Sequence, residues 1–200
     1  MPRLFTALEI APDAALALSF LRGGLPPARW IEAQDYHLTL RFIGDVEARL
    51  ADEIASGLDA IGRPAFELTL KGLGAFGSKK PHSIFAAAEP TAPLEALRAD
   101  IDRVCRRLGL AADPRKFTPH VTLARLRQPK AADVAQYLAG RGDFRAAPFK
   151  VTRFGLFSAR DSVGGGPYVL EVAYRLGGAP AARPADGEAG RDARTAGGYR

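Results

Sequence analysis

The stretch His37-Leu38-Thr39-Leu40 has a near copy 83 residues further along the chain, His120-Val121-Thr122-Leu123. Alternation of polar and apolar residues is typical of a half-buried strand, in which side chains i and i+2 share one face. Each copy therefore places an imidazole and a hydroxyl on the same face of a strand, about 6.5 to 7 Å apart. The repetition predicts two similar parts of the molecule, each contributing one such strand.

Hydrophobic periodicity and turn residues divide the rest of the chain into strands and helices. The expected strands cover residues 3–10, 36–43, 66–73, 83–88, 120–126, 149–158 and 168–176. The expected helices cover residues 12–22, 46–61, 93–108 and 131–138, with Gly44-Asp45 as the turn and N-cap before the second. We therefore predict an α+β fold of two pseudo-symmetric lobes, each a mostly antiparallel sheet with helices on its outer face, and an active-site groove between them.

Composition agrees with one globular domain followed by a tail. The chain has 200 residues, of which 47% are hydrophobic and 25% charged. We expect residues 1–176 to form the two-lobed domain and residues 177–200, rich in Gly, Ala and Pro, to be disordered. Apolar stretches fall short of the roughly 20 residues that span a bilayer, so no membrane segment is expected.

Cysteine usage indicates the compartment. Cys105 is the single cysteine, which excludes an internal disulfide and an all-cysteine metal site. A chain without disulfides is typical of a reducing compartment, so we expect a cytoplasmic protein, and a monomer.

Positive charge is concentrated in one part of the chain. The formal net charge is +6, and seven cations against one acid fall between residues 103 and 127. The cations are Arg103, Arg106, Arg107, Arg115, Lys116, Arg125 and Arg127, and the acid is Asp113. This concentration favours a polyanionic partner, and a solvated helix face is the alternative.

Two facing imidazoles suit displacement at phosphorus, which needs one group to deprotonate the nucleophile and another to protonate the leaving oxygen. With an ordinary pKa of about 6.5, one imidazole can begin neutral and the other protonated. The hydroxyls of Thr39 and Thr122 can donate to the non-bridging oxygens, and neither a metal nor a cofactor is required. A lone strand histidine is more often structural, but the duplication indicates that His37 and His120 serve one site. His82 follows a proline in a loop and is expected at the surface.

The paired motifs resemble those of the two-histidine phosphoesterase superfamily, and the flanking sequence is similar to bacterial and archaeal RNA 2',3'-cyclic phosphodiesterases, also called 2'-5' RNA ligases. The resemblance covers about residues 3–176. It is carried by Arg3-Leu4-Phe5-Thr6-Ala7-Leu8, Tyr36-His37-Leu38-Thr39-Leu40-Arg41-Phe42-Ile43-Gly44, Leu73-Gly74-Ala75-Phe76-Gly77 and Phe117-Thr118-Pro119-His120-Val121-Thr122-Leu123-Ala124-Arg125. One departure is Phe85, where the family often has a tryptophan.

The resemblance implies a role for each matched residue. His37 corresponds to the general acid that protonates the departing 3'-oxygen, and His120 to the general base that activates water, which leaves a 2'-phosphate. Thr39 and Thr122 match threonines that hold the phosphate, and Arg125 matches a basic residue near it.

Two of the matched residues, Arg125 and Phe42, would point to the opposite face of a regular strand from the histidines. Arg125 has the opposite parity to His120, so its role requires a bulge or the end of the strand. Phe42 has the same offset from His37; the resemblance favours stacking on a base, and periodicity alone favours the core.

We therefore predict a metal-independent RNA 2',3'-cyclic phosphodiesterase that binds RNA or nucleotides with 2',3'-cyclic phosphate ends. Two alternatives remain open: the reverse reaction, 2'-5' RNA ligation, and a non-catalytic RNA-binding module whose histidines only pack. A metal enzyme is disfavoured, since no pair of histidines has the spacing of metal ligands on one element.

Overall fold

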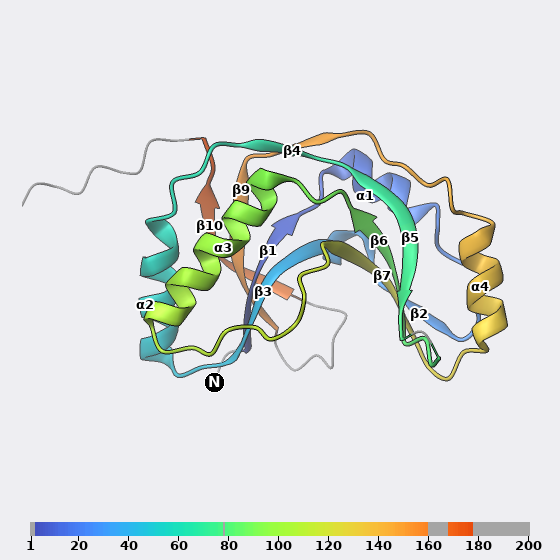
Figure 1. Ribbon diagram of the computed structural model, residues 1–200, viewed down its shortest axis with the longest axis horizontal. Helices are drawn as coiled ribbons and strands as arrows, with labels where there is room; N and C mark the ends of the chain where they lie inside the picture. The colour runs from blue at the N-terminus through green and yellow to red at the C-terminus, as the bar shows by residue number, and fades with distance from the viewer. Residues whose placement is uncertain (1–2, 78, 160–167, 178–200) are drawn as a thin grey trace, which may run out of the picture.

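The computed structural model describes residues 3–77, 79–159 and 168–177, which form an α+β fold (Figure 1). The strands are β1 (Arg3–Glu9), β2 (Ala28–Trp30), β3 (His37–Asp45), β4 (Phe66–Leu68), β5 (Leu70–Phe76), β6 (Ser83–Ala88), β7 (His120–Leu126), β8 (Phe149–Val151), β9 (Arg153–Ala159) and β10 (Tyr168–Arg175). The helices are α1 (Pro12–Ser19), the short 3-10 helix η1 (Ala33–Asp35), α2 (Ala48–Asp59), α3 (Ala92–Arg107) and α4 (Ala131–Ala139).

Eight of these strands form one sheet in the order β10-β9-β1-β3-β7-β6-β5, with β2 paired to β7 off this path. All of the registered strand pairs in it are antiparallel. Strands β3 and β7, which carry the two repeated tetrapeptides, are neighbours at its centre and share one registered pair, Leu38 with Val121. The predicted α+β class and mostly antiparallel pairing are confirmed.

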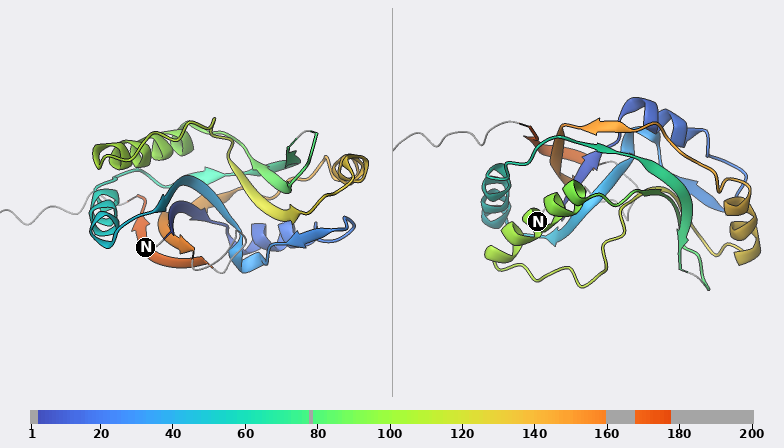
Figure 2. Two further views of the ribbon diagram at one scale, coloured as in Figure 1. Left: turned by 90° about the horizontal axis from the view of Figure 1, so that it is seen from below. Right: turned by 45° about the horizontal axis from the view of Figure 1, so that its top comes forward.

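The two halves of this sheet do not correspond to consecutive halves of the chain. One half holds β1, β3, β9 and β10, and helices α2 and α3 pack against it; the other holds β2, β5, β6 and β7, with α1 and α4 beside it (Figures 1 and 2). The two-stranded sheet of β4 and β8 runs across the top of Figure 1. The first half therefore combines strands from both ends of the sequence, the second half takes its strands from the middle, and each contains one copy of the tetrapeptide.

Helix α3 shows how local sequence positions an element. The Thr91 hydroxyl caps its start by accepting from the Leu94 amide, at 3.4 Å, and a proline lies in its first turn. Its buried stripe consists of Leu94, Leu97, Ile101 and Cys105. The opposite face is left to polar residues, and this helix contributes Arg98 to the site described below.

Several predicted boundaries differ from those in the structure. The expected strands 66–73 and 149–158 are each split, into β4 and β5 and into β8 and β9, because β4 and β8 leave the main sheet to pair with each other. Gly44-Asp45 was expected as a turn, but β3 continues through it, since Arg3 pairs with Asp45 in the register of β1 and β3 and donates to its carboxylate at 2.9 Å. The helix expected over 12–22 ends at Ser19, and β2 and η1 were not predicted.

No helix in the described ranges is long and apolar enough to cross a membrane. Residues 160–167 and residues 178–200 of the expected tail lie outside the described residues.

Candidate active site

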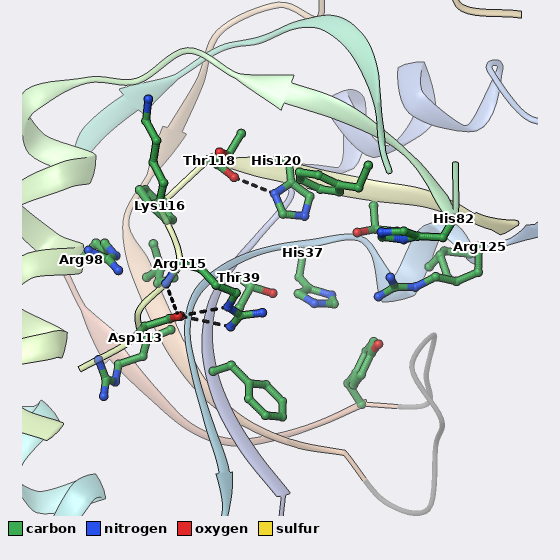
Figure 3. A pocket seen from close by; sticks show the side chains of 18 of the residues that line it. His37, Thr39, His82, Arg98, Asp113, Arg115, Lys116, Thr118, His120 and Arg125 are labelled. Carbon is green, nitrogen blue, oxygen red and sulfur yellow. Dashed lines mark hydrogen bonds and ion pairs between the residues drawn. The ribbon is translucent and has the colours of Figure 1, made fainter. Parts of the chain in front are cut away.

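A cavity of about 620 Å³ lies where β3 and β7 meet, between the two halves of the sheet (Figure 3). Its walls come from β3, β5, β7, α3 and the segment that precedes β7. The five residues predicted for the site all line it, namely His37, Thr39, His120, Thr122 and Arg125. The fold therefore brings the two sequence repeats together around one space.

The register of β3 and β7 fixes how the repeated side chains face each other. Leu38 pairs with Val121, and continuing the antiparallel register places Thr122 opposite His37 and Thr39 opposite His120. The two histidines are then diagonal neighbours on one face, with a separation on the order of 7–8 Å, which leaves room for a phosphoryl group. Each imidazole thus stands beside the hydroxyl of the other strand.

The two imidazole rings are oriented in the same way. Nδ1 of His37 lies 2.8 Å from the carbonyl oxygen of Asp35, and Nδ1 of His120 lies 2.7 Å from that of Thr118. A carbonyl oxygen only accepts, so in both rings Nδ1 carries the proton that is donated. In each neutral ring, Nε2 is consequently the nitrogen with a lone pair available for proton transfer.

Aromatic rings enclose both histidines. His37 packs against Phe5 and Tyr168, with ring centroids at 5.1 and 4.8 Å. His120 packs against Phe76 and Phe85, at 4.7 and 5.3 Å. Each half of the sheet therefore supplies its own apolar wall behind its own imidazole.

This enclosure determines the acidity of the rings. Burial lowers the pKa of His37, partly opposed by the hydrogen bond to the Asp35 carbonyl and by the Asp35 charge, and the charges of His120 and Arg125 lower it further. Burial also lowers the pKa of His120, against its bond to Thr118, and the charge of Arg125 acts in the same direction. Both imidazoles thus give up protons more readily than a free histidine does.

Matching bulges lie at the last residue of each tetrapeptide. On β3 the register with β1 skips Leu40, and on β7 the register with β6 skips Leu123. In each strand two consecutive buried residues result, and the parity of the side chains that follow reverses, on β3 until a second register shift at Ile43.

The bulges decide the orientation of the side chain five positions after each histidine. Arg125 is exposed and lines the cavity, so the bulge that its role requires is present. Phe42 also lines the cavity and its side chain is 45% exposed, so the alternative that periodicity favoured, a core position, is wrong.

The family model described as the 2'-5' RNA ligase superfamily matches residues 14–162. The chain belongs to this superfamily.

Its relatives in sequence include a protein named RNA 2',3'-cyclic phosphodiesterase from Geobacillus stearothermophilus, 35% identical over 134 residues, which are 64% of this chain and 43% of that one. A protein of the same name from Aeropyrum pernix is 35% identical over 103 residues, 50% of this chain and 58% of the relative. The chain thus spans about half the length of these two relatives. One from Aquifex aeolicus is 26% identical over 155 residues, 75% of this chain and 82% of that one.

The fold is shared with solved members. The structure of Escherichia coli LigT complexed with 3'-AMP superposes with a TM-score of 0.72 at 25% identity, over 88% of this chain and 99% of that one. TT0787 of Thermus thermophilus gives a TM-score of 0.71 at 23% identity, over 88% and 98%. The superfamily resemblance that the two motifs indicated is confirmed.

Sequence patterns missed several residues that line the cavity. His82, expected at the surface, is exposed but also lines the cavity, where its ring stacks on Phe76 with centroids 6.4 Å apart. Arg98 and Tyr168 line it from α3 and β10, and neither follows a motif that would have identified it. Of the basic stretch, Arg115, Lys116 and Arg125 reach the cavity; Arg103, Arg106, Arg107 and Arg127 are not among its lining residues.

Arg41 plays a structural part at the floor of the site. It is buried, forms an ion pair with Asp102 of α3, and donates to the carbonyl oxygen of Ala111 at 2.5 Å. It thereby ties β3 to α3 and to the segment leading into β7. In the described part of the chain, no group of three or more His, Cys, Asp or Glu side chains is arranged to hold a metal ion.

Proposed function

We propose that this protein hydrolyses the 2',3'-cyclic phosphate ends of RNA to 2'-phosphates, with His37 and His120 as its proton-transfer pair. The observation that carries the proposal is the arrangement of the two rings: each presents Nε2 from a hydrogen-bonded, aromatic-walled position on either side of one cavity. The names of the relatives support the substrate class, and the LigT complex with 3'-AMP supports a nucleotide ligand.

The proton transfers balance with these two residues alone. His120, neutral, takes a proton from water at Nε2 as the water oxygen bonds to phosphorus. The bond from phosphorus to the 3'-oxygen breaks, and His37, protonated, gives its proton to that oxygen. A 2'-phosphate and a 3'-hydroxyl result, and the next cycle requires His120 to return its proton to solvent and His37 to regain one.

Thr39, Thr122 and Arg125 bind charge in this mechanism. The register places one hydroxyl beside each imidazole, so both hydroxyls can donate to non-bridging oxygens of the same phosphate. Arg125, turned toward the cavity by the bulge at Leu123, adds a charged donor on the β7 side.

A bound phosphate changes the pKa values of the two histidines. Burial lowers the pKa of both imidazoles, which suits the base but disfavours the protonated acid. An anionic substrate between them stabilises the imidazolium of His37 and so raises its pKa in the complex. The site therefore reaches its working protonation state with substrate bound.

The proposed catalytic unit is residues 1–176. Leu176 is buried, and its amide donates to the Thr152 carbonyl at 2.7 Å, which closes β10 against the loop before β9. Tyr168, the first residue of β10, is part of the wall behind His37. Truncation before β10 would thus open the site.

Ligation in the 2'-5' sense is the second candidate, favoured by the superfamily to which the chain belongs. In ligation a 5'-hydroxyl takes the place of water: His120 accepts its proton as its oxygen bonds to phosphorus, the bond from phosphorus to the 3'-oxygen breaks, and His37 protonates that oxygen, which leaves a 2'-5' phosphodiester. Excess oligonucleotide with a free 5'-hydroxyl end would reveal it as a joined product.

The decisive experiment is incubation with a nucleoside 2',3'-cyclic phosphate and with an oligonucleotide bearing that end, followed by identification of the phosphate isomer. We expect the 2'-phosphate from both, at the same rate with and without a chelator. Formation of the 3'-isomer would overturn the assignment of the leaving oxygen. Salt-dependent RNA binding without turnover would show a binding module instead.

A further inference from the structure

The cavity has a second cationic end, remote from Arg125. Arg98 of α3 and Arg115 and Lys116 of the segment before β7 line the cavity on this side, and the Lys116 side chain is directed away from the other two (Figure 3). His37 and His120 lie between this group and Arg125 (Figure 3). The proposed mechanism uses Arg125 and leaves the other three without a part.

The three cations differ in whether the protein itself satisfies them. Arg115 donates from Nε and Nη2 to the carboxylate of Asp113, both at 3.0 Å, so that pair offsets its own charges. For Arg98 and Lys116, by contrast, no carboxylate of the described residues lies within ion-pair distance, although the charge of Arg98 still lowers the pKa of Asp113. The Nε of Arg98 is buried without a hydrogen-bond partner. A guanidinium that the protein leaves without an ion pair keeps donors available to an anion that enters the cavity.

The guanidinium of Arg98 is also held in place before any ligand arrives. Its central carbon lies 5.1 Å from the centre of the Phe117 ring, a cation–π contact that restricts the side chain. The next residue, Thr118, accepts the hydrogen bond from Nδ1 of His120. One short segment thus holds the Arg98 guanidinium, orients a proposed catalytic imidazole and carries Lys116.

We propose that Arg98 and Lys116 form a second phosphate subsite, which binds the internucleotide phosphate next to the cyclic end. This inference rests on the proposed function. A cyclic phosphate blocks the 3' end of an RNA, so the chain continues only on the 5' side, and the first charge met there is that phosphodiester. The subsite makes the enzyme prefer oligonucleotides to mononucleotides, which have no such group.

The test compares a dinucleotide ending in a 2',3'-cyclic phosphate with the corresponding mononucleotide. In R98Q, K116Q and the double variant we expect KM for the dinucleotide to rise by about tenfold for each lost contact, with kcat little changed. Mononucleotide turnover should stay at the wild-type level. R98K keeps the charge but loses the planar guanidinium, so its KM for the dinucleotide should lie between the values of R98Q and the wild type.

A neutral methylphosphonate at the internucleotide linkage removes the same interaction from the substrate side. In the wild type it should raise KM as the double variant does, and in the double variant it should have no further effect. The double variant R106Q/R107Q is the matched control, because it removes two charges from the same helix outside the cavity and should leave both substrates unaffected.

The possible outcomes separate the two proposals. No wild-type turnover of either substrate would overturn the proposed function. Wild-type turnover with equal losses on both substrates in R98Q/K116Q, or with a methylphosphonate penalty that persists in that variant, would overturn the subsite. R125A should lower turnover of both substrates and so provides the contrasting profile of a cation at the reacting phosphate.

Discussion

Leu38 of β3 and Val121 of β7 form the one registered pair between the two central strands, and both side chains are fully buried. They are the second residues of the two tetrapeptides, so this pair lies on a local twofold axis of the site. Around it the histidines, the threonines and the bulges at Leu40 and Leu123 correspond. The correspondence ends five residues after each histidine, where one strand has Phe42 and the other has Arg125.

This broken symmetry gives the two imidazoles different surroundings. Arg125 shares β7 with His120, while the equivalent place beside His37 is apolar. Acid and base must differ for net catalysis. The positive charge of Arg125 lowers the pKa of both imidazoles, whereas the negative charge of Asp35 raises the pKa of His37 alone, which favours the protonated form at the proposed acid.

The first prediction concerns the histidine pair. Replacing His37 or His120 by Ala should lower kcat/KM for a cyclic mononucleotide by about 10² to 10⁴, because each supplies a separate proton transfer. The double variant should be little worse than either single one.

His82→Ala is the matched histidine variant, since its ring lies in the same cavity on a loop outside the two motifs. We expect it to retain most of the activity. Near-wild-type turnover in His37→Ala or His120→Ala, with folding verified by circular dichroism, would contradict the two-histidine mechanism.

The second prediction is a bell-shaped pH dependence of kcat/KM whose maximum lies below pH 6.5. Activity rises with pH as the base loses its proton and falls as the acid loses its proton. Because burial lowers the pKa of both His37 and His120, both limbs move to lower pH than free imidazole would give. The limbs belong to the coupled pair and not to single residues.

Measurement of initial rates in buffers of constant ionic strength checks this profile. Thr39→Val, which retains both imidazoles, is the control for the position of the limbs. A profile that is flat from pH 5 to 9, or a maximum on the alkaline side, would contradict it.

The third prediction concerns the threonines, which bind charge and transfer no proton. Thr39→Val and Thr122→Val preserve shape and remove a hydroxyl, so each should cost about 1.5 to 3 kcal/mol of transition-state stabilisation, roughly 10- to 150-fold in kcat/KM. The pH limbs should stay in place. A limb that moves in either variant, with affinity unchanged, would show that the hydroxyl takes part in proton transfer.

Much of this architecture is predictable from local sequence. The boundaries of β6 and β7 agree with the residues expected, and all five expected site residues meet, because strand alternation and a repeated motif are short-range signals. Which strands join which half of the sheet depends on pairing between segments far apart in the sequence, and hydrophobic periodicity does not encode that pairing.

The remaining errors arise where tertiary structure overrides alternation. Strand alternation alone predicts that Phe42 is a core residue, but the bulge at Leu40 turns its side chain to the opposite face of β3. Arg98 reads as one of many exposed cations on an amphipathic helix, and only its position above Phe117 in the cavity distinguishes it. Neither feature could be found without the register or the packing of distant segments.

The last prediction tests the wall behind His120. Gly74 of β5 lies under the ring of Phe85, and a Cβ added there would come within 2.5 Å of the ring atom Cζ. Phe85 itself packs on Phe76 at 4.4 Å and on His120 at 5.3 Å, so it has little room to yield. We expect Gly74→Ala to cost about 1 to 3 kcal/mol of unfolding free energy through overpacking, and also to lower kcat by displacing the wall of the imidazole.

Gly57→Ala separates these two effects. Its added Cβ would lie 2.8 Å from Cγ1 of Val104, a contact between α2 and α3 outside the cavity, so it too should overpack the protein. Chemical denaturation should show a change in unfolding free energy for both variants, while kcat well below the melting transition should fall only in Gly74→Ala. Equal kcat in the two would mean that the Phe85 ring supports the fold without positioning His120, and a shifted pH limb in Gly74→Ala alone would show that the wall also determines the acidity of the ring.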